Sequence, residues 1–198
     1  MQLLQVDAFR DAKNVAGIAR IYQQAFGHHP WNEGSVCPVC ETVLPLGTNE
    51  KHCPECRKSG QAVLLTEYWS RSKVLSDFYR EMKRKGSLCV AVKERQNIVG
   101  FAWGYEVFVD TKLEQHLDAP NLTNLIQGKF FYLDECAISP NHQERGLGKM
   151  LVDYIFEQQK EEKILLRTLE DSRMFRLITN RGGTTVLRIS RDRVIMTL

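Results

Sequence analysis

Apolar side chains recur along the chain with two periods, which divide it into expected helices and strands. Between residues 15 and 25 the apolar positions are three or four residues apart, which predicts a helix capped by Asp11 or Asn14. A second stretch with the helical period reaches Met82, with Thr66 as its candidate cap. These two stretches predict a pair of helices in the first half of the chain.

After Met82, most apolar residues follow the two-residue alternation of β-strands. Residues 87–108 hold two β-rich runs around the polar turn KERQN, which is typical of a hairpin. The elements expected after it are a polar insertion at 110–128, a strand at 129–139, a helix from 147, a strand at 163–170, a short helix ending near 180, and strands at 184–189 and 193–198. With a first strand at 2–7, this order predicts an α/β fold with a mixed, mostly antiparallel central sheet flanked by helices.

Composition fits one globular domain spanning residues 1–198. The chain is 43% hydrophobic and 26% charged, and its net charge of +3 argues against nucleic acid as a partner. The start, MQLLQVDAFRDAKN, lacks the pattern of a signal peptide, and no apolar run reaches the length of a membrane span. We therefore expect a cytoplasmic protein without a membrane partner, whose six cysteines are thiols or thiolates.

Residues 31–60 have no sustained hydrophobic period and read as an insert within the domain. They carry two Cys-x-x-Cys pairs, which predict one closed tetrahedral site for a structural Zn²⁺ ion, with ligands Cys37, Cys40, Cys53 and Cys56. A proline follows the first cysteine of each pair, and in this the pattern resembles zinc-ribbon knuckles. Two disulfides or a redox-active pair are the rival interpretations. The neighbouring His52 is expected to be a bystander, and Cys89 and Cys136 to be core residues.

The stretch QERGLGK, from Gln143 to Lys149, joins an expected strand to an expected helix. A helix N-terminus presents unpaired N–H groups and partial positive charge, and glycine lets an anion approach the backbone closely. The spacing matches neither the phosphate loop of nucleotidases nor the dinucleotide-binding glycine motif. The stretch is therefore a candidate phosphate cradle, the alternative being that Gly146 and Gly148 only shape the start of the helix.

The spacing Gln-x-x-Gly-x-Gly after a strand resembles motif A of the GNAT family of N-acetyltransferases, and the order of elements outside the two insertions agrees with this. The resemblance implies that acetyl-CoA binds with its pyrophosphate against Gln143, Glu144, Arg145, Gly146, Leu147, Gly148 and Lys149. It also implies that backbone groups of the preceding strand face the pantetheine arm and the thioester, at Cys136, Ala137 and Ile138.

Acetyl transfer to an amine needs a base, because an amine with a pKa of about 10 is mostly protonated at neutral pH. The strand offers Asp134 and Glu135, which a regular strand points to opposite faces, with Asp134 on the face of Tyr132 and Cys136. The family resemblance favours Asp134, then Glu135; a water relay is the alternative.

The tyrosine that protonates the departing thiolate in many family members is not found here. In this chain the position of that tyrosine corresponds to Ile178. The family signature that contains the tyrosine begins with an asparagine, whose position corresponds to Asp171. Tyr154, Tyr105 or water are the candidates to replace it.

These interpretations combine into a leading function: an acetyl-CoA-dependent N-acetyltransferase that acts on an unidentified primary amine by direct attack on the thioester and carries a structural zinc site. Glu33, just before the cysteine insert, either attracts the ammonium group or is simply solvated, with Trp31 as packing. The alternative function is a catalytically weak acetyltransferase-like binding module whose zinc ribbon docks a protein or nucleic acid. A homodimer is left open.

Overall fold

The computed structural model describes residues 1–159 and 163–198. Its strands are β1 (Gln2–Gln5), β2 (Ser35–Val36), β3 (Val43–Leu44), β4 (Thr66–Glu67), β5 (Leu88–Glu94), β6 (Asn97–Phe108), β7 (Lys129–Ile138), β8 (Lys163–Leu169), β9 (Thr184–Arg188) and β10 (Arg193–Thr197). Its helices are α1 (Ala12–Phe26), α2 (Pro54–Lys58), α3 (Arg71–Met82), α4 (Thr111–Leu117), α5 (Leu122–Leu125), α6 (Leu147–Gln158) and α7 (Arg173–Thr179), with a 3-10 turn at Pro140–His142. No helix within these residues is both long and apolar enough to cross a membrane.

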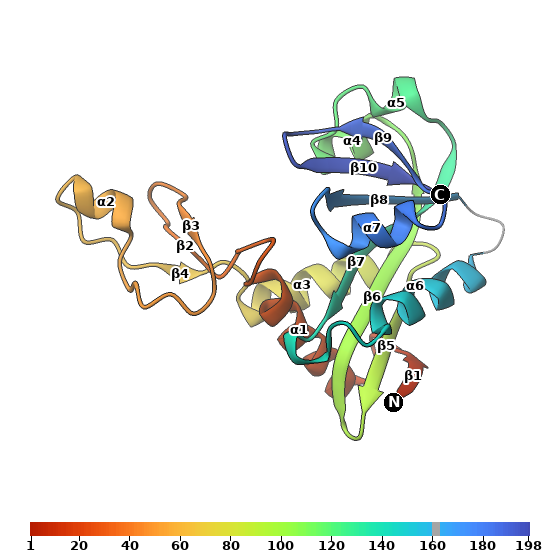
Figure 1. Ribbon diagram of the computed structural model, residues 1–198, viewed down its shortest axis with the longest axis horizontal. Helices are drawn as coiled ribbons and strands as arrows, with labels where there is room; N and C mark the ends of the chain where they lie inside the picture. The colour runs from red at the N-terminus through yellow and green to blue at the C-terminus, as the bar shows by residue number, and fades with distance from the viewer. Residues whose placement is uncertain (160–162) are drawn as a thin grey trace.

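A seven-stranded sheet in the order β1-β5-β6-β7-β8-β10-β9 forms the centre of the molecule (Figure 1). Its neighbours pair antiparallel except β7 and β8, which run parallel. Helices flank this sheet on both faces. The expected α/β fold with a mixed, mostly antiparallel sheet is therefore confirmed.

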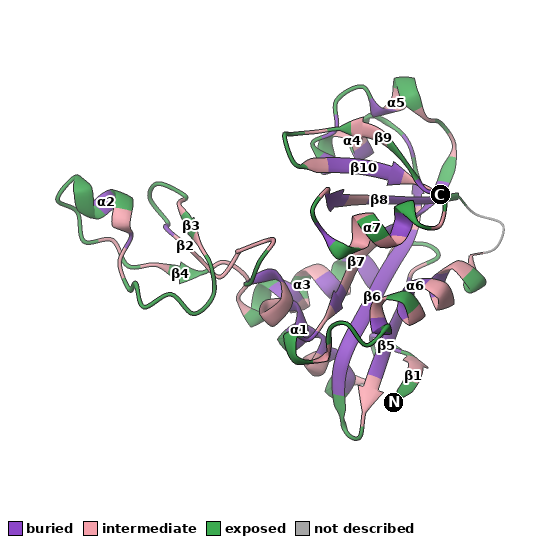
Figure 2. Ribbon diagram, in the orientation of Figure 1, coloured by how far each residue is buried: buried purple, intermediate pink, exposed green. Residues whose placement is uncertain are grey.

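Three hydrophobic clusters hold the layers together. On one face α1 and α3 pack on β6 and β7 around Phe101 and Trp103, and α4 and α5 cover the strands nearer β9. On the other face α6 packs on β5, β6 and β7 through Leu151 and Ile155, and α7 packs on β8. Figure 2 shows the middle strands buried and the outer helix faces exposed. The site described below is a cavity lined by residues from both faces of the sheet.

The expected polar insertion at 110–128 folds back onto the sheet. Asp110 caps α4 by accepting a hydrogen bond from the backbone N–H of Leu113 at 2.9 Å. Leu117 and Leu122 are fully buried in the cluster that also contains Tyr132 of β7. The stretch is thus part of the core on this face, and its polar residues lie on the outside.

The cysteine-rich insert forms an arm that projects from the main body next to α1 and α3 (Figure 1). We use the word arm for residues 35–67, which hold α2 and a three-stranded sheet in the order β3-β2-β4. Because Thr66 pairs with Val36 in that sheet, the arm continues past the expected boundary at Gly60. The expectation that Thr66 caps the next helix is wrong: Ser70 caps α3. Of the two caps considered for α1, Asp11 is the one observed.

A close approach between β6 and β7 yields a test of this packing. A Cβ atom on Gly104 would lie 2.3 Å from the Tyr132 carbonyl oxygen and 2.5 Å from the Phe131 ring. We expect Gly104→Ala to lower the free energy of unfolding by about 1–3 kcal/mol, because a backbone carbonyl cannot move aside. Urea denaturation would measure the change.

The matched control is Gly148→Ala. A Cβ atom there meets nothing within 4 Å, so that we expect a change within about 0.5 kcal/mol. Equal losses in the two variants would contradict the packing described for β6 and β7.

Candidate functional site

The parallel strands β7 and β8 separate part-way along their length. Their pairing covers only Phe130 to Tyr132 on β7 and Lys163 to Leu165 on β8, although β7 continues to Ile138. A cavity of about 950 Å³ opens beyond this point, and residues from both faces of the sheet line it. A cavity of this size suits a cofactor-sized ligand.

At one end of the cavity lies the loop that precedes α6. Gly146 is the N-cap of α6, with φ 75°, and no side chain caps the helix. A Cβ atom at Gly146 or Gly148 would meet nothing within 4 Å, so the first turn is open to a ligand. Unpaired N–H groups and the helix dipole at such an open turn favour an anion.

The residues expected to bind acetyl-CoA lie along this wall. All of them except Arg145 line the cavity: Cys136, Ala137, Ile138, Gln143, Glu144, Gly146, Leu147, Gly148 and Lys149. Arg145 instead lies 3.9 Å from Glu94. Two arginines of α7, Arg173 and Arg176, also line this end, and Arg173 pairs with Glu144 at 2.9 Å. Neither was predicted from the sequence to bind acetyl-CoA, because both follow the loop by more than twenty residues and no motif marks them.

A β-bulge places both candidate bases on the same face. The pairing of β6 with β7 shifts between Trp103 and Gly104, which leaves Asp134 as an extra residue on β7. Asp134 and Glu135 therefore both point towards α1 and α3, and the expectation that they face opposite sides is wrong. Cys136 packs in the cluster on the other face, so Asp134 does not share a face with it.

Asp134 and Glu135, which are partly buried and line the cavity, form a cluster of carboxyl groups with the buried Glu81 of α3. Trp103 donates its Nε1–H to Glu81 at 3.0 Å and lies 3.4 Å from Asp134. Tyr22 of α1 donates its hydroxyl hydrogen to Glu135 at 2.8 Å. The cluster thus joins both helices to the bulge.

Burial raises the pKa of each of these carboxyl groups, and their mutual repulsion adds to it. The pKa of Asp134 rises to about 6, that of Glu135 to about 8 and that of Glu81 to about 9. At neutral pH Asp134 is therefore mostly ionised, while the other two mostly keep their protons. Glu81 was not predicted from the sequence, although a glutamate between Phe78 and Met82 on an apolar helix face was a usable signal.

Neither tyrosine expected to replace the missing acid, Tyr154 or Tyr105, lines the cavity. Ile178 is fully buried in α7 and packs in the core. Tyr154 lines a separate recess beside α6, and Tyr105 is buried with Arg84 4.3 Å from its ring. The departing group therefore meets no tyrosine at these positions.

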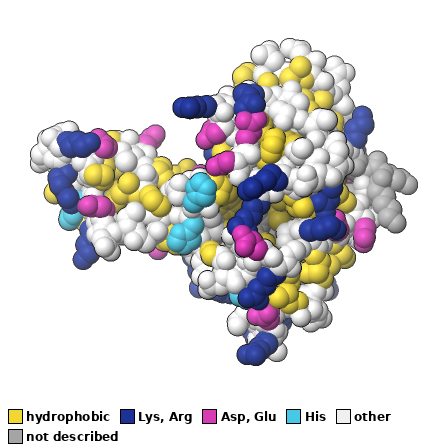
Figure 3. All heavy atoms as spheres, in the orientation of Figure 1, with side chains coloured by type: hydrophobic (Ala, Val, Ile, Leu, Met, Phe, Trp, Pro, Cys, Tyr) yellow, Lys and Arg dark blue, Asp and Glu magenta, His cyan; other side chains and the backbone are white. Residues whose placement is uncertain are grey.

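The other end of the cavity is lined by aromatic and charged side chains from α1, from the segments flanking the arm and from β8 and β10. Glu33 accepts a hydrogen bond from Trp69 Nε1 at 2.8 Å, and burial raises its pKa. It is thus a half-buried cavity residue and not a freely solvated one. Arg167 of β8 and Arg193 of β10 line the same cavity, and their charges act on Glu33 in the direction that lowers its pKa. Figure 3 shows acidic and basic side chains together around the hollow between the arm and the main body.

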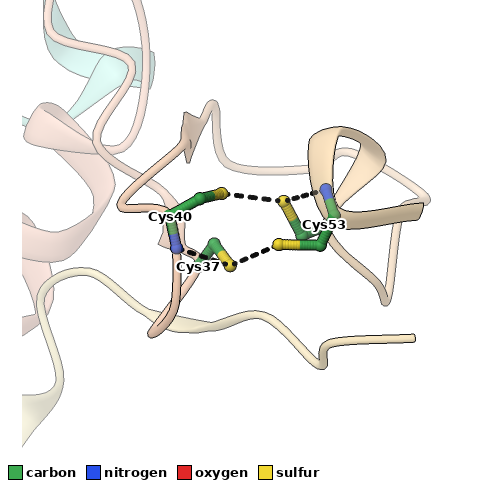
Figure 4. Close-up of side chains that lie close together, drawn as sticks. Cys37, Cys40 and Cys53 are labelled. Carbon is green, nitrogen blue, oxygen red and sulfur yellow. Dashed lines mark hydrogen bonds between the residues drawn. The ribbon is translucent and has the colours of Figure 1, made fainter. Parts of the chain in front are cut away.

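The four cysteines of the arm meet at one point (Figure 4). Their sulfur atoms all lie within 4.8 Å of one another, with Cys37 and Cys56 3.6 Å apart and Cys40 and Cys53 3.4 Å apart. Disulfide sulfurs lie about 2.05 Å apart. Around a tetrahedral zinc ion with bonds of about 2.3 Å, sulfurs are about 3.8 Å apart. The arrangement therefore fits a metal ion and not two disulfides.

The surroundings of three of the sulfurs, those of Cys37, Cys40 and Cys53, suit thiolates, whereas burial raises the pKa of Cys56. Backbone N–H groups point at Cys37 and Cys53, from Val39 at 3.4 Å and from Cys56 at 3.4 Å. The Thr42 side chain, 3.1 Å from the Cys40 sulfur, lowers the pKa of Cys40 to about 6. His52 is not among the clustered ligands.

Comparison with known proteins agrees with this fold. A family model described as the Acetyltransferase (GNAT) family matches residues 54–174, and the chain belongs to this family. No curated protein matches the chain. Among solved structures, the protein PH1933 from Pyrococcus horikoshii is 15% identical with a TM-score of 0.60, covering 99% of this chain and 96% of that one.

Two further structures show the same fold. The ribosomal-protein-S18-alanine N-acetyltransferase from Escherichia coli is 12% identical, with a TM-score of 0.53 and coverage of 100% of this chain and 92% of that one. The PaiA N-acetyltransferase from Thermoplasma acidophilum, solved in complex with coenzyme A, is 10% identical, with a TM-score of 0.51 and coverage of 99% and 96%. At these identities the likeness concerns the fold.

The carboxyl cluster predicts how stability depends on pH. Unfolded carboxyl groups titrate near about 4, whereas the three folded ones keep their protons to about 6, 8 and 9. The folded state thus binds more protons, and the contribution of the cluster to the free energy of unfolding falls as pH rises from about 5 to about 9. We expect Glu81→Gln to make this fall shallower, measured by urea denaturation at several pH values.

The control is Glu157→Gln, which removes an exposed carboxylate on α6. Its pH dependence should follow that of the unaltered protein. An unchanged slope in Glu81→Gln would show that Glu81 does not hold its proton in the folded chain.

Proposed function

We propose that the protein is an acetyl-CoA-dependent N-acetyltransferase that transfers an acetyl group to a primary amine. One observation carries the proposal: a single cavity is lined both by the open N-terminus of α6 and by the partly buried carboxyl group of Asp134, whose pKa of about 6 leaves it mostly ionised at neutral pH. The first group suits the pyrophosphate of acetyl-CoA, and the second suits removal of a proton from an ammonium group.

The separated edge of β7 positions the thioester between these two groups. With the pyrophosphate at Gly146 and Gly148, the pantetheine arm runs along Cys136, Ala137 and Ile138, where β7 has no strand partner on the β8 side. Backbone N–H groups on such an edge hydrogen-bond the thioester carbonyl oxygen as it gains negative charge. Lys149, Arg173 and Arg176 add positive charge for the phosphates.

Asp134 acts as the base in this proposal. It takes one proton from the acceptor ammonium, and the free amine attacks the thioester carbonyl carbon. The C–N bond forms, the C–S bond breaks, and the second proton lost by the nitrogen ends on the CoA sulfur. Since the tyrosine position of the family is Ile178, we propose that CoA leaves as its thiolate and is protonated through water.

The arm holds a structural Zn²⁺ ion in our proposal, bound by Cys37, Cys40, Cys53 and Cys56. The four ligands leave no coordination position for substrate, so the ion stabilises the fold of the arm and takes no part in the reaction. Burial in the arm is confined to Cys37, Cys53 and Cys56, with Val63 and Leu65 partly buried against them. This is too little to fold the arm without metal.

An acceptor screen tests the proposal directly. Zinc-loaded protein is incubated with acetyl-CoA and sets of primary amines, and mass spectrometry identifies any product that has gained an acetyl group. Thiol reagents are avoided because they would also attack the cysteine cluster. Binding of acetyl-CoA without transfer to any amine would leave only the binding-module interpretation.

Replacing the base should have a large effect. We expect Asp134→Asn to lower kcat by about 100-fold to 10,000-fold, the usual contribution of a general base. In the unaltered protein kcat/KM should rise with pH through the range from about 6 to about 8, as the coupled carboxyl groups lose their protons.

The control is Glu157→Gln, which should keep both the rate and the pH profile. If Asp134→Asn kept the full rate while Glu135→Gln lost it, the roles of the two carboxyl groups would be reversed. If neither variant lost activity, the carboxyl groups would not supply the base.

Loss of the metal should affect the arm only. We expect Cys53→Ser to abolish binding of about one zinc per chain and to make the arm sensitive to protease, while the central sheet keeps its fold. Elemental analysis and limited proteolysis would measure both effects. The control Cys89→Ala alters a buried cysteine of β5 and should keep the zinc; loss of zinc in both variants would contradict the assignment of the ligands.

A further inference from the structure

Two arginines at the acceptor end of the cavity have no acidic partner. Neither Arg167 nor Arg193 lies within 4.0 Å of a carboxylate of the residues that the structure describes. Two other cations of the same cavity are paired: Lys149 lies 2.7 Å from Asp153, and Arg173 pairs with Glu144. A half-buried guanidinium without an ion-pair partner loses hydration, and more distant charges such as Glu33 compensate for this only in part.

The sheet brings these arginines together and fixes their direction. Arg193 pairs with Leu169, and Ile195 pairs with Arg167, so the two arginines are diagonal neighbours on adjacent strands and share one face of the sheet. Arg167 donates one hydrogen bond to the carbonyl oxygen of Leu117 at 3.2 Å. The guanidinium of Arg193 lies 5.9 Å from the Trp31 ring, within the range of a cation–π contact.

Carboxyl groups from other elements line the same cavity. Asp134 and Glu135 project from β7 onto this face, and Glu33 lies at the opening with Trp69. Burial raises the pKa values of Asp134 and Glu135, while Arg167 acts on both in the opposite direction, which places its charge within electrostatic reach of them. The acceptor end is therefore divided into an acidic wall and a basic wall.

A simple amine would use only half of these groups. Its ammonium would bind at the carboxyl groups, but Arg167 and Arg193 would stay unpaired beside a positively charged substrate. A planar guanidinium pair is suited to two-pronged hydrogen bonding with a carboxylate or a phosphate. The aromatic rings of Tyr22, Trp31 and Trp69 supply apolar surface between the two walls.

We propose that the acceptor carries an anionic group, a carboxylate or a phosphate, in addition to its primary amine, and that Arg167 and Arg193 bind this anion while the acidic wall receives the ammonium. This inference rests on the proposed acetyl transfer. It narrows the acceptor from amines in general to zwitterionic amines. Arg167 and Arg193 then decide specificity and take no part in the bond changes.

The test compares matched acceptors that differ only in the anion. One series is 2-phenylethylamine, phenylalanine and 1-amino-2-phenylethylphosphonate; the other is ethylamine, β-alanine and 2-aminoethylphosphonate. Calorimetric titration of zinc-loaded protein saturated with CoA measures binding without turnover. We expect at least one anionic compound to bind about tenfold or more tightly than its plain amine, and the carboxylate and phosphonate arms to show which anion is preferred.

The variant Arg193→Gln should remove this preference and leave the affinity for the plain amine unchanged. Its matched control, Arg191→Gln, alters an exposed arginine in the turn just before β10 and should keep the preference. Equal affinity for plain and anionic amines, a preference that survives Arg193→Gln, or failure of every compound to bind would each overturn the inference.

The two proposals fail separately. Acetyl transfer from acetyl-CoA to the plain amines, without preference for their anionic partners, would overturn the zwitterion inference and keep the acetyltransferase function. Binding of the anionic compounds that depends on Arg193, without transfer to any amine, would overturn the acetyltransferase function and leave only an anion-binding site at the two arginines.

Discussion

The parting of β7 from β8 is the feature on which the rest of the site depends. Two parallel strands normally satisfy each other's backbone hydrogen-bonding groups. Here the pairing ends at Tyr132 and Leu165, while β7 continues to Ile138. The opening creates the cavity, exposes one edge of β7 to a ligand and leads directly to the start of α6. The bulge at Asp134 falls at the same point and turns two consecutive carboxyl groups to one face.

This geometry also accounts for the electrostatic character of the site. The bulge brings Asp134 and Glu135 beside Glu81. Trp103 and Tyr22 supply hydrogen bonds there, and Arg80 lies 3.4 Å from Glu81 at the edge of the cluster. Three acidic groups so close together cannot all be ionised, and their pKa values spread apart. Asp134 then remains mostly charged near neutral pH. The cavity that it lines also contains the N-terminus of α6 and the two arginines Arg167 and Arg193. The arm borders the same opening through Trp31, Glu33 and Trp69.

The fold and the cysteine cluster could be predicted from the sequence because each depends on local signals. Hydrophobic periods mark the elements, and the spacing of Cys37, Cys40, Cys53 and Cys56 restricts how the four thiolates can meet. The direction of Glu135 could not be predicted, because a bulge is set by pairing between strands and not by the residues of one strand. Thr66 failed as a cap for a similar reason: its partner, Val36, lies thirty residues away. Glu81, Arg167 and Arg193 join the site only through the tertiary fold.

The central claim is that the cavity between β7 and β8 binds acetyl-CoA through the first turn of α6. Calorimetric titration of the zinc-loaded protein with acetyl-CoA tests it most directly, alongside the variant Gly146→Glu, whose carboxylate would enter the open space at the helix N-terminus, and the control Glu157→Gln. The account predicts micromolar or tighter binding by the unaltered protein and the control, and its loss in Gly146→Glu. Absence of binding by the unaltered protein, or equal affinity in all three, would contradict it.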